Sequence, residues 1–335
     1  MPPATGMPVT APELHTMKIP FLLFCLLLNP ALASNGSLQE AIELYGKGKF
    51  AQAEGMLQQL SASTPSNAEV WVWLSKARLK TRDWDKAVQA MEKAVQLQPA
   101  NAGYHLLLGR ACGDRASHSS FLTAMSWARR VVKEFETARE LAPEDVDVRF
   151  DLLDYYLEAP GIVGGGKDKA EAEAQTIARL NPKKGYLARA TIHIKNKKWD
   201  LARNELARAA AENPQSVSAH KDLADFLLNR KDFKGALDHA NKALLLDPKS
   251  KRSLLIAAAA RIRLKSDLEK AAESLHALLA GTLSEGDPDF EEVYYWLGEY
   301  WLTAGESRRA QEAFKTALLF NPEYSRARDG LSKSK

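Results

Sequence analysis

The feature that most constrains this chain is a pattern of helix, turn and helix in residues 68–101 that recurs as far as the C-terminus. The first helical period of this unit is carried by Trp71, Leu74, Ser75 and Arg78. A second period of the same spacing is carried by Ala87, Met91, Ala94 and Leu97, and Pro99 ends it. Spacings of three and four residues place side chains on one face of an α-helix. The unit therefore predicts two amphipathic helices, and its recurrence predicts an array.

These positions resemble the tetratricopeptide repeat (TPR), a helical pair of about 34 residues that stacks into arrays. In residues 68–101 the positions typical of that repeat hold Trp71, Leu74, Ser75, Ala87, Ala94 and Pro99. Two further copies hold Leu223, Ala224, Ala236, Ala243 and Pro248, and Tyr294, Leu297, Gly298, Ala310, Ala317 and Pro322. Small residues let the two helices of a unit approach closely. The resemblance implies an all-α, right-handed superhelical solenoid of paired antiparallel helices.

The same frame divides the chain after residue 33 into eight predicted repeats and a terminal helix. The repeats span residues 34–67, 68–101, 102–145, 146–182, 183–216, 217–250, 251–290 and 291–324. A repeat array grows by stacking neighbours without a second core, so one solenoid is expected. Residues 325–335 are expected to form a capping helix that faces water. Residues 281–288 replace the usual proline with a longer link, which we interpret as a hinge.

The third and fourth repeats depart from the frame. Repeat 3 is ten residues too long, and one helical period continues through the excess at Phe121, Met125, Ala128, Val132, Phe135 and Ala138. We therefore expect a lengthened second helix that begins near Ser119 and is capped by Ser119 or Ser120. Repeat 4 contains a glycine-rich loop, residues 159–166. The two features together are similar to those of a group of exported bacterial TPR proteins of unassigned role.

Residues 1–33 have the pattern of a secretory signal peptide behind a short extension. A basic residue precedes an apolar run, residues 19–28, and the small residues Ala-Leu-Ala follow it before Ser34. Met17 is the predicted start, and cleavage is predicted before Ser34. The apolar run is too short to span a bilayer, and no lipid is expected on Cys25, so no stable membrane anchor is expected. These residues predict an exported protein, and the resemblance to exported bacterial TPR proteins implies one that is periplasmic or secreted by a bacterium.

The sequence offers little for catalysis or nucleic-acid binding. Its 46 basic and 42 acidic residues are too evenly balanced for a nucleic-acid reader. Residues 161–167, G-I-V-G-G-G-K, match a phosphate-binding loop, but they follow a predicted helix, and Asp168 stands where Ser or Thr would bind magnesium. We interpret the segment as a flexible connector, with nucleotide or anion binding as the alternative. The histidines have no metal-ligand spacing, so we expect no enzyme, metal or cofactor.

The resemblance implies a partner segment bound in the concave groove that the first helices of the repeats line. Charge along the chain reverses there, because residues 134–158 carry nine acidic and two basic residues, whereas residues 160–210 carry five acidic and eleven basic ones. The groove positions of repeats 4 and 5 include Asp147, Phe150, Asp154, Leu157, Glu158, Lys184, Leu187 and Lys195. Either the two faces neutralise each other, or they orient a charged partner.

The lengthened helix of repeat 3 adds Phe121, Met125 and Trp127 to the candidate partner-binding residues. Trp127 lies off the apolar stripe, so it either packs on repeat 4 or contacts a partner. A well-known version of the groove grips a carboxylate with Asn at the ninth position, which this sequence never has. Its ligands are therefore not implied. We expect a monomeric, non-enzymatic scaffold for a protein or peptide whose Lys or Arg residues flank an apolar side chain.

Overall fold

A computed structural model describes residues 37–334, so the predicted signal peptide and its cleavage site lie outside the described residues. The chain separates into two units, residues 1–35 and residues 36–335, and the second, which we call the repeat unit, is described by itself. Within the described residues the repeat unit is helical and contains no strand, which confirms the predicted all-α class. In that part of the chain, no helix is both apolar enough and long enough to cross a membrane.

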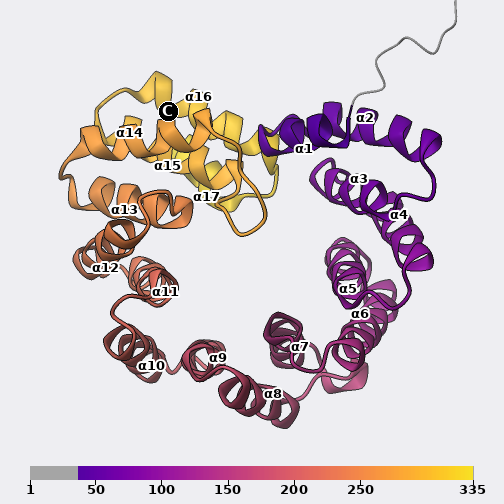
Figure 1. Cartoon of the computed structure of the whole chain (residues 1–335). Helices are drawn as coiled ribbons and strands as arrows, with labels where there is room; N and C mark the ends of the chain where they lie inside the picture. The colour runs from indigo at the N-terminus through magenta and orange to yellow at the C-terminus, as the bar shows by residue number, and fades with distance from the viewer. Residues whose placement is uncertain (1–36, 335) are drawn as a thin grey trace, which may run out of the picture. The chain divides into compact units, whose positions relative to one another are not determined.

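The helices follow one another as antiparallel pairs. In chain order they are α1 (Leu38–Gly46), α2 (Phe50–Ser63), α3 (Ala68–Lys80), α4 (Trp84–Leu97), α5 (Ala102–Ser117), α6 (Phe121–Leu141), α7 (Val146–Glu158), the 3₁₀ turn η2 (Gly161–Val163), α8 (Lys167–Leu180), α9 (Pro182–Lys195), α10 (Trp199–Glu212), α11 (Val217–Asn229), α12 (Phe233–Leu246), α13 (Lys251–Leu264), α14 (Leu268–Ala280), α15 (Phe290–Thr303), α16 (Ser307–Phe320) and α17 (Ser325–Lys333). Figure 1 shows that odd-numbered helices such as α5, α7, α9 and α11 line the inner side of a curve.

Capping residues fix where many of these helices begin. The side chains of Asn67, Asn101 and Asp145 accept backbone N–H groups in the first turns of α3, α5 and α7. Such caps satisfy donors that a helix end would otherwise leave unpaired. Pro182 occupies the first turn of α9, where its missing N–H has no intrahelical bond to lose. Local sequence therefore sets the helix boundaries that the repeat frame predicts only approximately.

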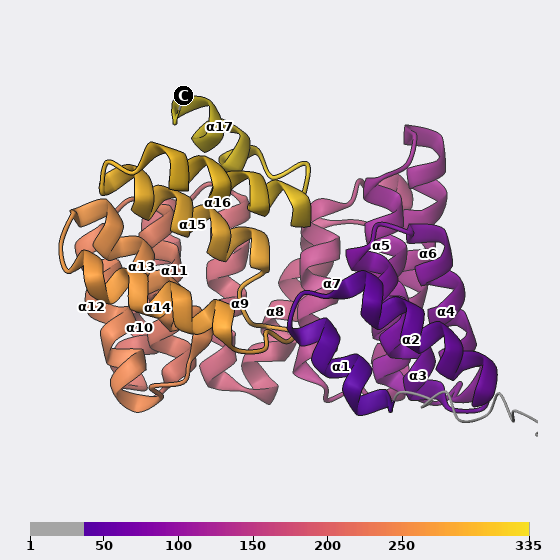
Figure 2. The ribbon, with the colours of Figure 1, turned by 90° about the horizontal axis from the view of Figure 1, so that it is seen from above.

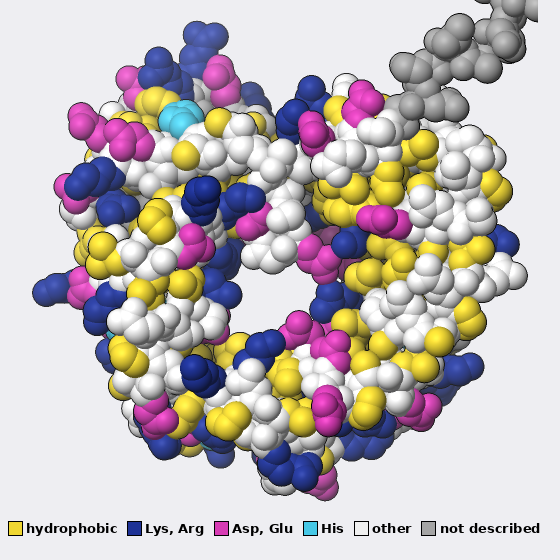
Figure 3. All heavy atoms as spheres, viewed as in Figure 1, with side chains coloured by type: hydrophobic (Ala, Val, Ile, Leu, Met, Phe, Trp, Pro, Cys, Tyr) yellow, Lys and Arg dark blue, Asp and Glu magenta, His cyan; other side chains and the backbone are white. Residues whose placement is uncertain are grey.

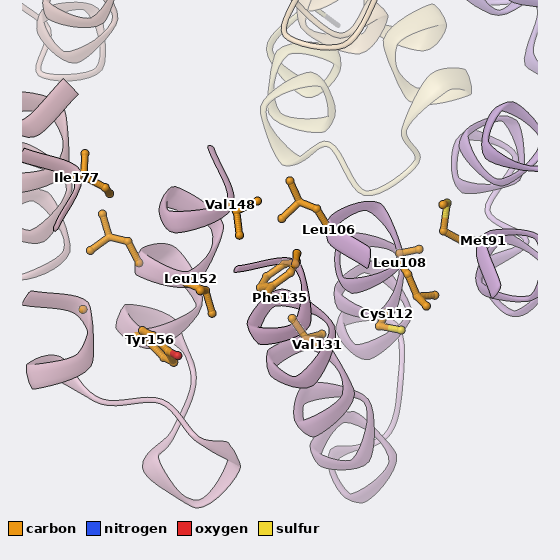
Figure 4. Close-up of a cluster of buried hydrophobic side chains, with 14 of the residues drawn as sticks. Met91, Leu106, Leu108, Cys112, Val131, Phe135, Val148, Leu152, Tyr156 and Ile177 are labelled. Carbon is orange, nitrogen blue, oxygen red and sulfur yellow. The ribbon is translucent and has the colours of Figure 1, made fainter. Parts of the chain in front are cut away.

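Small residues hold the two helices of a pair close together. The hydroxyl of Ser75 on α3 donates to the carbonyl of Ala87 on α4 at 2.8 Å. A Cβ added at Gly109 on α5 would lie 2.4 Å from the ring of Phe135 on α6, closer than real contacts allow. Figure 4 shows Phe135 and Val131 of α6 packed between Leu108 of α5 and the side chains of α7. The core therefore follows the array as a series of clusters between successive helices.

The lengthened third repeat differs from the prediction in how it uses its extra residues. Helix α6 has 21 residues and begins at Phe121 after Ser120, close to the predicted start. Helix α5 is also extended, to 16 residues, so the excess is shared between both helices rather than added to the second alone. Apolar residues on α6 and small ones on α5, such as Gly109, pair over this length. The result is a longer helical hairpin within the array.

The repeat unit curves until its C-terminal helices return to its N-terminal ones (Figures 1 and 2). The ring of Phe50 on α2 lies 6.1 Å from that of Phe290 on α15 and 6.0 Å from that of Phe320 on α16. Arg82 forms an ion pair with Glu323 at 2.6 Å. Residues 281–289, which we call the strap, join α14 to α15 and also take part in this closure. The curve is therefore closed by contacts between the first and the last repeats.

One expectation from the sequence is wrong at this closure. The strap is not a hinge, because the N–H of Leu283 donates to the carbonyl of Gly46 at 2.6 Å and its side chain is only 6% exposed. Helix α17 exposes charged residues such as Arg326, Arg328 and Asp329 and turns its small residues towards the last repeat. Its Ala327 is fully buried, and a Cβ added at Gly330 would lie 2.5 Å from the ring of Phe314. Both segments are packed rather than free.

Candidate functional site

The inner face of α7 carries most of the acidic residues that the sequence singled out. Lys184 of α9 pairs with Asp147 at 2.7 Å, and Lys195 of α9 pairs with Glu158 at 2.7 Å. All four side chains are 43% or more exposed. These pairs join successive inner helices, so part of the charge reversal is neutralised within the array. That is the first of the two alternatives that the sequence left open.

Further ion pairs engage most of the other charged groups around α7. Arg139 and Arg149, the two bases of the acidic stretch, both bind Glu173 of α8, at 2.8 and 2.7 Å. Glu173 is buried, at 6% exposure, so the two arginines compensate a carboxylate that could not stay charged alone. Asp151 of α7 pairs with Arg110 of α5 at 2.8 Å. Most of the charged groups around α7 therefore have structural partners.

Asp154 is the exception on the inner face of α7. It is exposed and belongs to none of the ion pairs among the described residues. Partial desolvation inside the curve, together with Asp151 and Glu158, raises the pKa of Asp154 to about 6, although Lys195 acts in the opposite direction. A carboxylate that is crowded by like charges gains from a cation brought by another molecule. Asp154 is therefore the group on this face best placed to bind a basic side chain.

Apolar residues flank this carboxylate without being free of the core. Phe150 and Leu157 are half-buried and pack against the cluster that runs from α3 to α9. Leu187 of α9 is half-buried against the next cluster. Each side chain thus has one edge in the core and another at the inner surface. We call Asp147, Phe150, Asp154, Leu157 and Glu158 with Lys184, Leu187 and Lys195 the α7–α9 face.

The structure does not bring the lengthened helix onto the α7–α9 face. Helix α6 lies on the outer side of α7 (Figure 1), so Phe121 and Met125 belong to a different surface. Phe121 is 78% exposed at the end of α6, whereas Met125 is half-buried. Trp127 packs against the core cluster, and its ring centre lies 5.9 Å from the guanidinium group of Arg115 and 5.7 Å from that of Arg130. Its ring is therefore occupied within its own repeat.

The backbone N–H groups of the glycine-rich loop are hydrogen-bonded within the loop and to the end of α7. The N–H groups of Val163 and Gly165 donate to Pro160, that of Gly164 to Gly161, and that of Gly166 to Tyr156. A phosphate-binding loop needs such groups free to point at the anion. The hydroxyl of Tyr155 lies 2.5 Å from the carbonyl oxygen of Val163, which is itself buried. The loop is therefore an ordered connector, and its geometry does not fit the nucleotide-binding alternative.

A second charged surface, which the sequence did not single out, lies where the strap crosses the first repeats. We call the inner faces of α1, α3 and α5 the N-terminal groove. Glu285 of the strap lies between Lys76 at 2.8 Å and Arg110 at 2.7 Å, and Asp289 pairs with Lys80. A cavity of about 590 Å³ lies beside these pairs, and Tyr45, Trp73 and Trp84 contribute to its wall. Figure 3 shows basic and acidic side chains around the central opening.

A sequence signal for this surface did exist. Lys76 and Arg110 occupy the same groove position of successive repeats, and Lys80 lies one turn after Lys76. The strap carries Glu285, Asp287 and Asp289, which are opposite in charge to these bases. Nothing in the periodicity says that two segments so far apart in the chain meet, because their contact depends on the accumulated curvature of the array.

Comparison with known families and proteins agrees with this geometry. The family model described as tetratricopeptide repeat matches residues 38–102, 74–112 and 187–251. The chain is a tetratricopeptide-repeat protein. Among curated proteins, it is 22% identical over 281 residues to human protein O-mannosyl-transferase TMTC3, across 76% of this chain and 30% of that protein. It is 25% identical over 253 residues to human anaphase-promoting complex subunit 7, across 65% of this chain and 43% of that protein.

Solved TPR structures show the same fold at low identity. Yeast Tom70 aligns with a TM-score of 0.55 and 16% identity, over 86% of this chain and 58% of that chain. The human IFIT1 dimer with m7Gppp-AAAA aligns with a TM-score of 0.51 and 15% identity, over 88% of this chain and 70% of that chain. The TPR chain spans less than half the length of the curated relatives it matches. These comparisons therefore establish repeat and fold, and the function must be argued from the surfaces.

Proposed function

We propose that this TPR protein is a non-catalytic scaffold of the bacterial cell envelope that binds a segment of a partner protein along the inner surface of its array. Support for protein binding comes from the fold. A stacked helical array builds an extended concave surface. Arabidopsis peroxisome biogenesis protein 5 and anaphase-promoting complex subunit 7 are named for an organelle and an assembly, whereas protein O-mannosyl-transferase TMTC3 is named for a reaction. Support for the envelope comes only from the signal-like residues 1–33.

Asp154 is the observation that carries the choice of surface. It is exposed on the α7–α9 face without an intramolecular ion pair, while apolar edges of Phe150 and Leu157 lie on the same helix. Its pKa is raised to about 6 by desolvation and by the like charges of Asp151 and Glu158, which Lys195 offsets only in part. A partner segment with a Lys or Arg next to an apolar residue would supply that cation and cover the apolar edges. The neighbouring lysines, Lys184 and Lys195, would fix the orientation of the segment.

The test begins with the partner itself. Crosslinking in the native envelope followed by purification of the TPR protein identifies candidates, and the affinity of each is then measured with the purified chains. Asp147→Lys combined with Asp154→Lys should slow association several-fold and reduce its salt dependence, because exposed charges act over about 8 Å at physiological ionic strength. Phe150→Ala should mainly speed dissociation, with some loss of stability because the ring is half-buried.

A matched control makes the charge reversal interpretable. Glu140→Lys with Glu171→Lys changes the net charge by the same amount on the outer helices α6 and α8, at exposed residues outside the ion pairs of the described chain. Association should be slowed only weakly in this variant. An affinity that ignores the reversal on α7, or responds equally to both pairs, would place the binding surface elsewhere.

The proposed location has its own test. Mass spectrometry of the exported protein should find Ser34 at the N-terminus without a lipid. A mature chain that begins at Met17, or one acylated at Cys25, would contradict the proposed processing. Neither result would bear on the α7–α9 face, so location and binding are tested separately.

A further inference from the structure

The strap lies in the N-terminal groove in the manner of a bound peptide. Its main chain reaches α1, where the N–H of Leu283 donates to the carbonyl of Gly46 at 2.6 Å. The side chain of Leu283 is 6% exposed, so it is the buried apolar anchor of the segment. Two residues later Glu285 binds Lys76 and Arg110, and Asp289 then binds Lys80. One apolar anchor followed by spaced carboxylates is a pattern that a separate chain could also present.

Local hydrogen bonds give the strap this shape. The carboxylate of Asp287 accepts the N–H of Ser284 and its hydroxyl, each at 2.8 Å, and pairs with Lys251 at 2.8 Å. Asp287 therefore turns towards the strap itself and α13, whereas Glu285 and Asp289 turn towards the groove. The groups that recognise the groove are thus a subset of the strap: Leu283, Glu285 and Asp289. A competing segment needs only this subset.

The contacts between strap and groove are of a kind that can exchange. The side chains of Glu285 and Asp289 are 56% and 57% exposed. Ion pairs at such exposure contribute little individually and are screened by salt. The main-chain contact with Gly46 is one hydrogen bond. Closure of the array has an independent part, the aromatic contacts of Phe50 with α15 and α16, so release of the strap does not require the repeat unit to come apart.

The groove is also larger than the strap fills. A cavity of about 590 Å³ remains between the strap and the inner helices, within the range of pockets that hold small ligands. Its wall includes Tyr45, Trp73 and Trp84, together with Lys76 and Arg82. The ammonium group of Lys76 lies 4.8 Å from the ring centre of Trp73. A segment with bulkier side chains than those of the strap would therefore find both space and aromatic surface.

We propose that the N-terminal groove is a second binding surface, for an acidic, extended protein segment with a large apolar residue two positions before a carboxylate, and that the strap is its intramolecular occupant. A partner segment of this chemistry displaces the strap. This surface is distinct from the α7–α9 face, whose partner is basic. The protein then carries two inner surfaces of opposite charge preference, one open and one covered by its own chain.

Tethering sets how the competition runs. A segment linked to its own site acts at an effective concentration in the millimolar range, so a free segment of equal intrinsic affinity binds weakly until the strap is weakened. Leu283→Ala with Glu285→Gln removes the apolar anchor and one charge from the strap while leaving the groove residues in place. This variant should bind an acidic segment several-fold more tightly than the unmodified chain does.

The probe for this test is the peptide of residues 281–290, labelled with a fluorophore and titrated with the purified repeat protein. Fluorescence anisotropy should show weak binding to the unmodified chain and tighter binding to the strap-weakened variant. The control peptide replaces Glu285 and Asp289 by Gln and Asn and should bind at least several-fold more weakly. Lys76→Ala with Arg110→Ala, added to the strap-weakened variant, should abolish binding, whereas Asp147→Lys with Asp154→Lys should leave it unchanged.

A reversible lock provides a control within one protein. A Cβ added at Gly46 would lie 3.0 Å from the Cβ of Thr282, only a few tenths of an ångström short of the 3.5–4.5 Å typical of disulfides. Gly46→Cys with Thr282→Cys should therefore hold the strap in place when oxidised, and the native Cys112 is buried. Because the strap-weakening changes would be retained, the reduced protein should bind the peptide and the oxidised one should not. Equal binding in both states would overturn the proposal.

Hydrogen exchange tests the proposal in the unmodified chain, without relying on any variant to fold. The amide of Leu283 should exchange slowly in the free protein, because it is bonded to Gly46. At saturating peptide it should exchange several-fold faster, while amides of α7 keep their protection. Unchanged protection at saturating peptide, or no binding of peptide to the strap-weakened variant, would show that the strap only closes the array.

Discussion

The N-terminal groove and the α7–α9 face are both built from inner helices of the array, yet their charges are satisfied in different ways. In the groove, Lys76 and Arg110 bind a carboxylate 209 and 175 positions further along the chain. On the α7–α9 face, Lys184 and Lys195 bind carboxylates that are each 37 positions away, on the preceding inner helix. One arrangement closes the array, and the other only reinforces stacking that already exists. Similar exposed ion pairs therefore have different consequences at the two places.

This difference decides what an outside molecule can replace. A partner that replaces Asp147 in its ion pair with Lys184 leaves the helices held by the buried residues of the core, so the array does not change. A partner that replaces Glu285 in its ion pair with Lys76 competes with the whole strap and releases it from the groove. The first surface can bind without a conformational change, whereas the second couples binding to release of the strap. Three predictions distinguish stacking, closure and individual charges, in order of decreasing effect.

The largest effect should come from breaking the stack between the two regions. Ala224 of α11 is fully buried, so Ala224→Arg forces a charge into the contact between α11 and α12. We expect a loss of roughly 3–5 kcal/mol in the free energy of unfolding and a divided transition, because arrays couple mainly through neighbours. Chemical denaturation followed by circular dichroism measures both.

Two control variants calibrate that result. Ala207→Arg places the same residue at an exposed site of α10 and should change stability little. Ala327→Arg in α17 should be costly, because Ala327 is fully buried against the last repeat. A small loss at Ala327 would mean that α17 adds little to the stability of the last repeat. A transition that stays cooperative with Ala224→Arg would mean that closure, not stacking, holds the two halves together.

The second prediction uses charge reversal to distinguish the ion pairs that close the array from those that join stacked helices. Lys76→Glu with Lys80→Glu should free the strap and lower stability by roughly 1–2 kcal/mol, since the pairs are exposed and screened. Protection of the Leu283 amide from hydrogen exchange should fall about tenfold, as a change of 1.4 kcal/mol implies. Lys184→Glu with Lys195→Glu makes the same change in net charge and should leave that amide protected. Equal loss of protection in both variants would remove the distinction between the two surfaces.

The fold could be predicted from the sequence because its signals are local and repeated. Small residues such as Ser75 and Ala87 mark the close approach of paired helices, and the hydroxyl of Ser75 does donate to Ala87. Each repeat carries its own copy of this information, so no long-range contact is needed to read it. Where a repeat departs from the frame, the sequence predicts the structure less well. Its periodicity places the extra residues of repeat 3 in the second helix alone, whereas α5 and α6 share them.

The candidate sites could be predicted only in part, for a physical reason. Charges on neighbouring inner helices can be placed by the frame, so the proximity of Asp147 and Lys184 follows from the sequence. The meeting of Glu285 with Lys76 does not, since it depends on small rotations accumulated over every repeat between them. The same contact turned an expected hinge into a packed strap. The role of Trp127 is also ambiguous in the sequence, because only the structure shows that two arginines lie near its ring.

The smallest expected effect is that of a single carboxylate charge on the stability of the folded chain. Glu285 of the N-terminal groove and Asp154 of the α7–α9 face should affect this stability in opposite directions. Burial raises the pKa of Glu285, but Lys76 and Arg110 outweigh it and hold that pKa below its usual value. Its charge therefore stabilises the folded chain above pH 4.5, and that stability is lost as the pH falls through the folded pKa. Desolvation, Asp151 and Glu158 raise the pKa of Asp154 to about 6, from 3.8. Its charge therefore costs stability, increasingly from pH 3.8 to 6 and fully above that.

Neutral replacements should consequently act in opposite directions. At pH 7.5, Asp154→Asn should raise the midpoint of thermal unfolding by about 1–2 °C, and Glu285→Gln should lower it by a similar amount. The effect of Asp154→Asn should shrink towards zero near pH 3.5, where that carboxyl group is protonated in the folded chain, whereas the effect of Glu285→Gln should shrink only as the pH falls through the lowered pKa of Glu285. Differential scanning calorimetry of the two variants and the unmodified chain at both pH values measures this. If Asp154→Asn were destabilising at pH 7.5, the carboxylate would already have a cationic partner within the chain, and the α7–α9 face would lose its reason to bind a basic segment.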